Sequence, residues 1–159
     1  MTGVQTCALP ILTADATQAR RLQWAALGEA LGTRNRWMAP SSDGTRLMAV
    51  HTPHIGGVLH EYRLDGDRLV GRAVANDLST HRIGSRELDL AVWLGSRLVV
   101  PQQDGLALRV LDAAAAWAEV ASVAVPSRVA MTAALSGTQG TQGLAALLDD
   151  GSVFSIGMP

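Results

Sequence analysis

Residues 61–94 read EYRLDGDRLVGRAVANDLSTHRIGSRELDLAVWL, and this stretch decides the fold class that the rest of the chain must fit. An apolar run leads into Asp65, a tight turn follows at 64–67, and a second apolar run occupies 68–75. A polar link at 76–88 then leads into a third apolar run. Short apolar runs bounded by Gly and Asp turns are typical of antiparallel β-strands. The stretch therefore predicts strands joined by hairpins.

The same order of features occurs in two more places, at 11–40 and at 109–135. Each copy has an aspartate at the end of its first apolar run, namely Asp15, Asp65 and Asp112, so the intervals are 65 − 15 = 50 and 112 − 65 = 47 residues. The first copy matches the pattern least well, because two residues separate its apolar run from Asp15, whereas Asp65 and Asp112 directly follow a leucine. A period of about 50 residues with four short strands per unit is the spacing of a β-propeller blade.

Further apolar runs between turn signals extend this pattern along the chain. The predicted strands are 46–53, 58–64, 68–75, 89–95, 96–103, 106–113 and 117–125. We expect an all-β fold of antiparallel four-stranded blades that form an incomplete β-propeller, with about three blades present. The expected units are a lone outer strand near 21–31, full blades over 35–75 and 89–125, and three strands over 128–158.

Two segments allow a helical alternative. Residues 16–31 and 112–125 are rich in alanine, leucine and glutamate, which are good helix formers. The second segment, however, ends in a valine-rich run and aligns with 68–75, where the interior Gly71 suits a helix poorly. The strand interpretation is therefore favoured for both segments.

Residues 12–159 resemble bacterial β-propeller repeat proteins in general, and no subfamily motif narrows the resemblance. The chain has no Trp-Asp dipeptide, the kelch-like Gly56-Gly57 occurs once, and Asp65-Gly66-Asp67 is too short for a calcium loop. The resemblance implies that residues 12–159 are the C-terminal portion of a propeller domain whose N-terminal blades lie outside this chain.

The first residues have a different character. Residues 1–11, MTGVQTCALPI, carry the one cysteine, Cys7, and resemble a translated sequencing adapter rather than a secretion signal. We therefore predict that 1–11 is a non-native segment and that the native domain occupies 12–159.

Composition excludes several function classes. The thirteen basic residues are all arginine, they lie singly or in pairs among fourteen acidic residues, and the net charge is −1. No basic face for nucleic acid is indicated. Without Cys7 the chain has no thiol for a disulfide or a thiolate metal site. No apolar run approaches the roughly 20 residues that a membrane-spanning helix needs, and the sequence does not fix a compartment.

In a propeller, the loops that join blades and the loops between the second and third strands of a blade emerge on one face around the axis. This rule selects the following polar residues: Arg34, Asn35, His51, His54, His81, Arg82, Arg86, Gln102, Gln103 and Ser127. We predict a binding site centred on His81 and Arg82, with His51, His54 and Arg86 around them. Its expected partner is an anionic small molecule, a glycan or a protein, because arginine forks favour carboxylate or phosphate and histidines make such binding pH-dependent.

The predicted function is that of a non-catalytic binding or scaffolding propeller. A propeller hydrolase or lyase that uses axial His and Arg residues is the alternative, although no nucleophile motif, phosphate loop or paired-carboxylate motif is present. No cofactor is predicted. No metal site is predicted either, because His51 and His54 lack helical spacing and no carboxylate completes a set.

Overall fold

The computed structural model describes residues 10–14, 22–28, 39–137 and 142–158. Its strands are β1 (Pro10–Ala14), β2 (Leu22–Gly28), β3 (Ser41–Ser42), β4 (Leu47–His51), β5 (Val58–Asp65), β6 (Arg68–Ala75), β7 (Val92–Leu94), β8 (Arg97–Pro101), β9 (Ala107–Asp112), β10 (Ala118–Ala124), β11 (Val129–Ser136), β12 (Gln142–Leu148) and β13 (Val153–Met158). One short 3-10 turn, η1 (Ala113–Ala115), follows β9. The described residues contain no α-helix, which confirms the all-β prediction.

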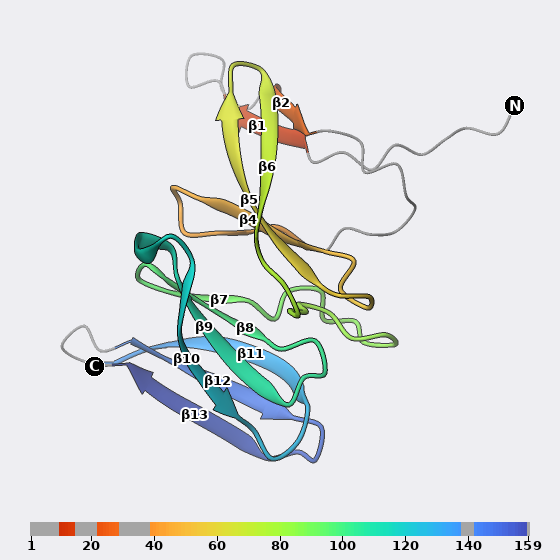
Figure 1. The fold of residues 1–159 in the computed structure, drawn as a ribbon, viewed down its shortest axis with the longest axis vertical. Helices are drawn as coiled ribbons and strands as arrows, with labels where there is room; N and C mark the ends of the chain where they lie inside the picture. The colour runs from red at the N-terminus through yellow and green to blue at the C-terminus, as the bar shows by residue number, and fades with distance from the viewer. Residues whose placement is uncertain (1–9, 15–21, 29–38, 138–141, 159) are drawn as a thin grey trace, which may run out of the picture.

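The strands form three sheets (Figure 1). Sheet 1 has the order β1-β2-β6-β5-β4-β3, sheet 2 has the order β10-β9-β8-β7, and sheet 3 has the order β11-β12-β13. Neighbouring strands are antiparallel, except that β2 and β6 pair in parallel over two residue pairs. The groups β3–β6, β7–β10 and β11–β13 match the predicted units of four, four and three strands. The predicted lone outer strand near 21–31 is wrong, because β2 pairs with β1 and with β6, so sheet 1 has six strands rather than four.

The helical alternative is wrong where the structure describes it. Leu22–Gly28 and Ala118–Ala124 are both strands, and only the three residues of η1 between β9 and β10 are helical in character. The Asp112 side chain accepts a hydrogen bond from the Ala114 amide and caps that turn. A single capped turn lets β10 fold back on β9, so the alanine-rich run makes a hairpin connection rather than a helix.

Sheet 2 lies between the other two sheets, and its strands β7, β8 and β9 are covered on both faces, whereas its outer strand β10 is largely exposed. Leu98, Val100 and Leu111 pack toward sheet 1, whereas Val99 and Val110 pack toward sheet 3. The alternation follows from the period of two in a strand. The core between sheets 1 and 2 is Met48, Val50, Leu59, Leu78, Leu98, Val100, Leu111 and Trp117. The core between sheets 2 and 3 is Val92, Leu94, Val99, Leu108, Val110, Val125, Val129, Leu144, Ala146 and Leu148.

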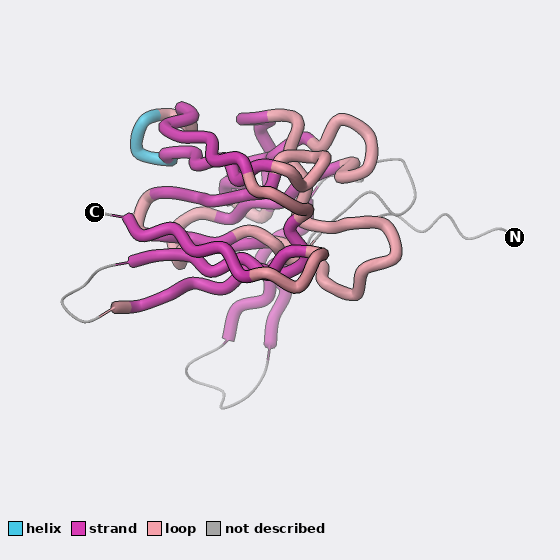
Figure 2. Tube along the Cα trace, turned by 90° about the horizontal axis from the view of Figure 1, so that it is seen from below, coloured by secondary structure: helices cyan, strands magenta, loops and turns pink. Residues whose placement is uncertain are grey.

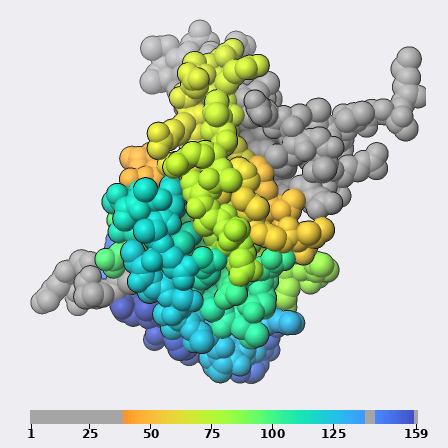
Figure 3. Space-filling model, viewed as in Figure 1, coloured from red at the N-terminus to blue at the C-terminus, as the bar shows by residue number. Residues whose placement is uncertain are grey.

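The two ends of this stack are less covered. The β5–β6 hairpin projects away from sheet 2, as the yellow-green segment of Figures 1 and 3 shows, and residues 63–68 at its tip are exposed. On the other end, large apolar side chains of sheet 3 are exposed; these are Met131, Leu135, Leu147 and Val153. No helix among the described residues has the length and apolar character needed to cross a membrane.

The long β6–β7 link and shorter connections between the other strands meet at one edge of the stack, opposite η1 (Figure 2). They are tied by backbone hydrogen bonds. The Leu78 amide donates to the Gly57 carbonyl at 3.0 Å, and the Ser79 amide donates to the Pro101 carbonyl at 3.0 Å. The Val129 amide donates to the Gly105 carbonyl at 3.0 Å. These bonds hold the loops of successive sheets together and position the site described next.

The predicted boundary at residue 11 falls at the start of the described chain. Pro10 and Ile11 are the first residues of β1 and pair with Leu27 and Ala26. Residues 1–9, Asp15, Arg34 and Asn35 lie outside the described residues. The assignment of 1–11 as a non-native segment stays a prediction.

Candidate functional site

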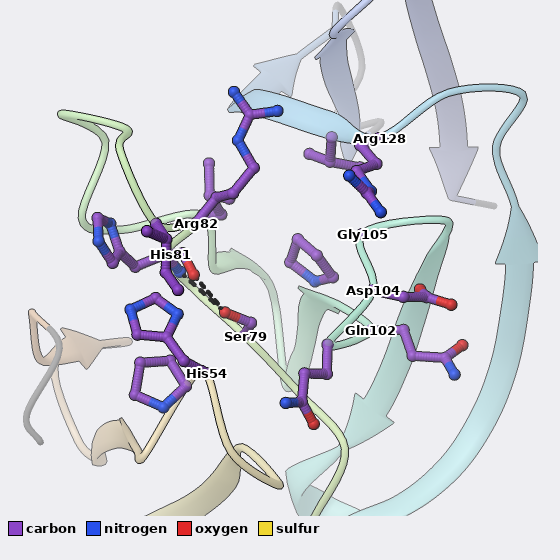
Figure 4. A pocket seen from close by; sticks show the side chains of 14 residues that line it. His54, Ser79, His81, Arg82, Gln102, Asp104, Gly105 and Arg128 are labelled. Atoms are coloured by element: carbon purple, nitrogen blue, oxygen red, sulfur yellow. Dashed lines mark hydrogen bonds between the residues drawn. The ribbon is translucent and has the colours of Figure 1, made fainter.

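A cavity of about 230 Å³ lies where the loops of the three sheets meet, and we call it the junction cavity (Figure 4). Its lining residues are Pro53, His54, Ser79, His81, Arg82, Ile83, Leu90, Pro101, Gln102, Gln103, Asp104, Gly105, Arg128 and Val129. They come from the β4–β5 loop, the long β6–β7 link, the β8–β9 loop and the β10–β11 link, together with the last residue of β8 and the first residue of β11. The cavity therefore depends on the packing of all three sheets.

The β4–β5 loop is fixed against the β6–β7 link at Gly57. This residue has a φ of 31°, and a Cβ atom on it would lie 1.7 Å from the carbonyl oxygen of Leu78. Glycine is required here by both the backbone conformation and the close approach. The amide of the neighbouring Gly56 donates to the Gln103 side-chain oxygen at 3.1 Å, which joins the loop to sheet 2. His54 is carried into the cavity by this anchored loop.

His81 is held by its own loop. Its Nδ1 lies 2.7 Å from the carbonyl oxygen of Glu87. A carbonyl only accepts hydrogen bonds, so Nδ1 carries the proton and donates it, and Nε2 of the neutral ring keeps a free lone pair. The Ser79 hydroxyl donates to the His81 carbonyl at 2.5 Å and accepts from the His81 amide at 3.2 Å. The ring orientation and the backbone of His81 are thus both fixed.

His54 and His81 lie beside each other on one wall of the cavity, and Arg128 lies on the opposite wall (Figure 4). The two imidazole rings have their centroids 5.2 Å apart and their planes tilted by 59°. Burial, and then the nearby His81, lower the pKa of His54 below its ordinary value. The neutral form of His54 is therefore favoured at neutral pH.

The two arginines of the cavity differ in their partners. Arg82 forms an ion pair through Nη1 with Asp149, which lies in the turn between β12 and β13. Arg128 has no carboxylate partner among the described residues, although its carbonyl accepts from the Asp149 amide at 2.9 Å. Asp104 is the one carboxylate among the described residues that line the cavity. Arg128 is consequently the cation most available to a ligand.

The structure brings together three of the five predicted site residues. His54, His81 and Arg82 line the junction cavity, together with Gln102 and Gln103 from the wider set selected by the loop rule, whereas Ser127 does not. Arg86 is on the same link but is exposed and outside the lining.

His51 is also outside the cavity, contrary to the prediction. It is the last residue of β4, only 8% exposed, and its ring stacks on His60 with centroids 3.7 Å apart. Its Nε2 shares a hydrogen bond with the Tyr62 hydroxyl. Because His51 still belongs to the strand, its side chain follows the strand alternation onto a face of sheet 1 rather than into the loop.

Sequence reasoning missed Ser79, Asp104 and Arg128. Arg128 directly precedes β11 and so lies in the same class of link as His81, which is the signal that could have selected it. No group of three or more His, Cys, Asp or Glu side chains that could hold a metal ion occurs within the part of the chain that the structure describes.

The cavity joins two imidazoles and the Arg128 guanidinium to apolar walls of proline, leucine and valine. Such a set can hold a carboxylate or phosphate group by charge-assisted hydrogen bonds. Comparisons of this chain with protein-family models, with curated proteins and with solved structures returned no match.

Proposed function

We propose that this chain is a non-catalytic binding domain, that its three sheets are consecutive blades of a β-propeller, and that the junction cavity binds a small anion. Two features support the propeller assignment. The consecutive antiparallel groups β3–β6, β7–β10 and β11–β13 lie in three successive sheets, the first of which also carries the β1–β2 hairpin, and each sheet packs face to face on the next. The loops that line the cavity are those that a propeller gathers around its axis.

The binding proposal rests mainly on the guanidinium of Arg128. It lines a partly apolar cavity and has no ion-pair partner among the described carboxylates. A guanidinium presents paired donors that match carboxylate and phosphate oxygens. The imidazoles of His54 and His81 add polar contacts from the opposite wall, and Asp104 is the one carboxylate among the described lining residues.

The volume of the cavity limits the size of the ligand that it can hold. A volume of about 230 Å³ is below the roughly 300–1,000 Å³ of sites for drug-sized ligands, and it equals about eight water molecules at liquid density. A small carboxylate or phosphate with an apolar part fits this space. Among the predicted partners, an anionic small molecule is therefore favoured over a glycan or a protein.

The hydrolase or lyase alternative gains no support from the serine of the cavity. Both hydrogen bonds of the Ser79 hydroxyl go to the backbone of His81, whereas a nucleophilic serine needs a hydrogen bond to a general base such as an imidazole or an amine. The contacts of Ser79 are those of a turn.

Isothermal titration calorimetry of the full chain against phosphate, malonate, benzoate and glucuronate, at constant ionic strength, tests the proposal. We expect at least one of these anions to bind with one equivalent per chain. Arg128→Ala should weaken that binding about 10- to 100-fold, because a charge-assisted hydrogen bond contributes roughly 1.5–3 kcal/mol.

Arg86→Ala is the matched control, since Arg86 is an exposed arginine of the β6–β7 link outside the cavity. It should leave the affinity unchanged. An equal loss in both variants would mean that the anions respond only to overall charge, and no binding of any anion by the wild-type chain would contradict the proposal.

A further inference from the structure

We propose that His54 and His81 together form a binding site for a divalent transition-metal ion at the wall of the junction cavity. The site uses the same cavity as the anion proposed above, but it depends on different side chains and does not rest on anion binding. The sequence predicted no metal site, because His51 and His54 lack helical spacing and no carboxylate completes a set. The structure instead pairs His54 with His81.

The geometry of the two rings matches shared coordination. A metal–nitrogen distance of about 2.0–2.1 Å places the metal about 3.2 Å from each imidazole centroid, and a tetrahedral angle between the ligands then puts the centroids roughly 5.2 Å apart. The observed separation is 5.2 Å. The planes are tilted by 59°, so the rings do not stack and two ring nitrogens can converge on one point.

The hydrogen bond from His81 Nδ1 to the Glu87 carbonyl is an independent indication. Metal-binding histidines commonly donate their second ring nitrogen to a carbonyl or carboxylate, which fixes the ring and leaves the other nitrogen unprotonated. The 2.7 Å bond of His81 has this arrangement and presents Nε2 as the ligand atom. His81 is thus prepared to bind a metal ion before any ion arrives.

The charges on the wall that carries the histidine pair permit a cation, because Arg128, which has no carboxylate partner among the described residues, lies on the opposite wall of the cavity. Arg82, the cation next to His81 in the sequence, is neutralised by its ion pair with Asp149. Asp104 adds a carboxylate to the same cavity. Since the described chain supplies no third protein ligand close enough, water or a small anion must complete the coordination. With two imidazoles and water, Cu²⁺ should bind more tightly than Ni²⁺ or Zn²⁺.

The test is a titration of the full chain with CuCl₂ in a buffer that does not coordinate metals, in a Cys7→Ser background so that the thiol does not compete. We expect one equivalent of Cu²⁺ to bind, with an electron paramagnetic resonance spectrum that reports two imidazole nitrogens. His54→Ala and His81→Ala should each weaken binding by roughly ten-fold or more, because each removes a ligand.

The other two histidines of the fold supply the control. His60→Ala should leave the affinity unchanged, since His60 stacks on His51 on a face of sheet 1. An unchanged affinity in both His54→Ala and His81→Ala, or an equal loss in His60→Ala, overturns the proposal.

A second measurement needs no variant and therefore does not depend on folding of the mutants. Paramagnetic Cu²⁺ broadens the ring proton resonances of its ligands, so the His54 and His81 signals should disappear before those of His51 and His60. The reverse order overturns the proposal. The metal titration contains no carboxylate or phosphate, and the anion titration contains no metal. A negative result in one titration therefore contradicts only the proposal that it tests and does not affect the other.

Discussion

The four described histidines form two pairs that differ in almost every physical respect. His51 and His60 lie on neighbouring strands, stack at 3.7 Å with an interplanar angle of 15°, and are shielded beside Tyr62. His54 and His81 lie in loops of two different segments, are separated by 5.2 Å, and are tilted by 59° in an open cavity. We call His51 and His60 the strand pair, because a sheet holds them, and His54 and His81 the loop pair, because contacts between loops hold them.

This difference shows that the supporting backbone decides what a histidine can do. Adjacent strands place the rings of His51 and His60 face to face, so their nitrogens cannot converge on one ion. In loops, the orientation of a side chain is not set by the strand alternation, so the rings of His54 and His81 can be tilted toward each other. The close contact of Gly57 with Leu78 fixes the β4–β5 loop and so holds His54 beside His81. The strand pair therefore contributes to stability, whereas the loop pair is available for binding.

Replacing Gly57 should have the largest effect and should disrupt the loop pair first. In Gly57→Ala, the new Cβ would meet the Leu78 carbonyl oxygen at 1.7 Å in a backbone region that favours glycine. We expect a loss of more than about 3 kcal/mol in the free energy of unfolding, measured by urea denaturation, because both overpacking and backbone strain are introduced. Binding of Cu²⁺ should be lost with it.

Gly56→Ala provides the comparison for that variant. Gly56 also has a positive φ, 80°, but nothing lies within 4 Å of the position that an added Cβ atom would take. The substitution should cost only about 1 kcal/mol of conformational strain. Equal losses in the two variants would show that the contact with Leu78 does not hold the loop.

Lowering the pH should act mainly on the strand pair. Burial, and then the nearby His60, lower the pKa of His51 to about 4 from its ordinary value of 6.5. The unfolded state therefore binds more protons between these values, so the stability contributed by neutral His51 is present above pH 6.5 and is lost as the pH falls toward 4. The expected loss between pH 7 and 4.5 is about 2 kcal/mol.

Chemical denaturation at a series of pH values measures this loss. His51→Gln should flatten the profile, because it removes the titrating group and keeps a polar side chain near Tyr62. The double variant His54→Gln, His81→Gln should keep most of the profile. If the double variant alone flattened it, the assignment of structural and binding roles to the two pairs would be reversed.

The smallest effect on stability is expected at the ion pair beside the loop pair. The side chains of Arg82 and Asp149 are 45% and 30% exposed, so Asp149→Asn should change the free energy of unfolding by less than about 1 kcal/mol. The same change releases the Arg82 guanidinium toward the cavity. Anion affinity measured by calorimetry should therefore rise a few-fold, and a fall in affinity would mean that Arg82 needs Asp149 for its position.

Local sequence determined the strands and their grouping. Turns such as Asp65-Gly66 and Asp150-Gly151 end the apolar runs, and the period of two assigns Leu98 and Val99 to opposite faces of sheet 2. These features depend on neighbours within a few residues, so the strands from 46 to 125 and a further group of three over 128–158 could be predicted. The short strand β3 was missed, because its residues were assigned to a turn. The propeller to which they are assigned stays a prediction.

The composition of the site was decided only by the tertiary structure. His51 and His54 are three residues apart, yet the first ends a strand and the second lies in a loop, where it meets His81. Arg82 is paired with Asp149, which is 67 residues away, through the packing of sheet 3 on sheet 2. Sequence patterns report the backbone periodicity of each element, whereas side-chain partners across sheets depend on how the sheets pack, and that information is not local.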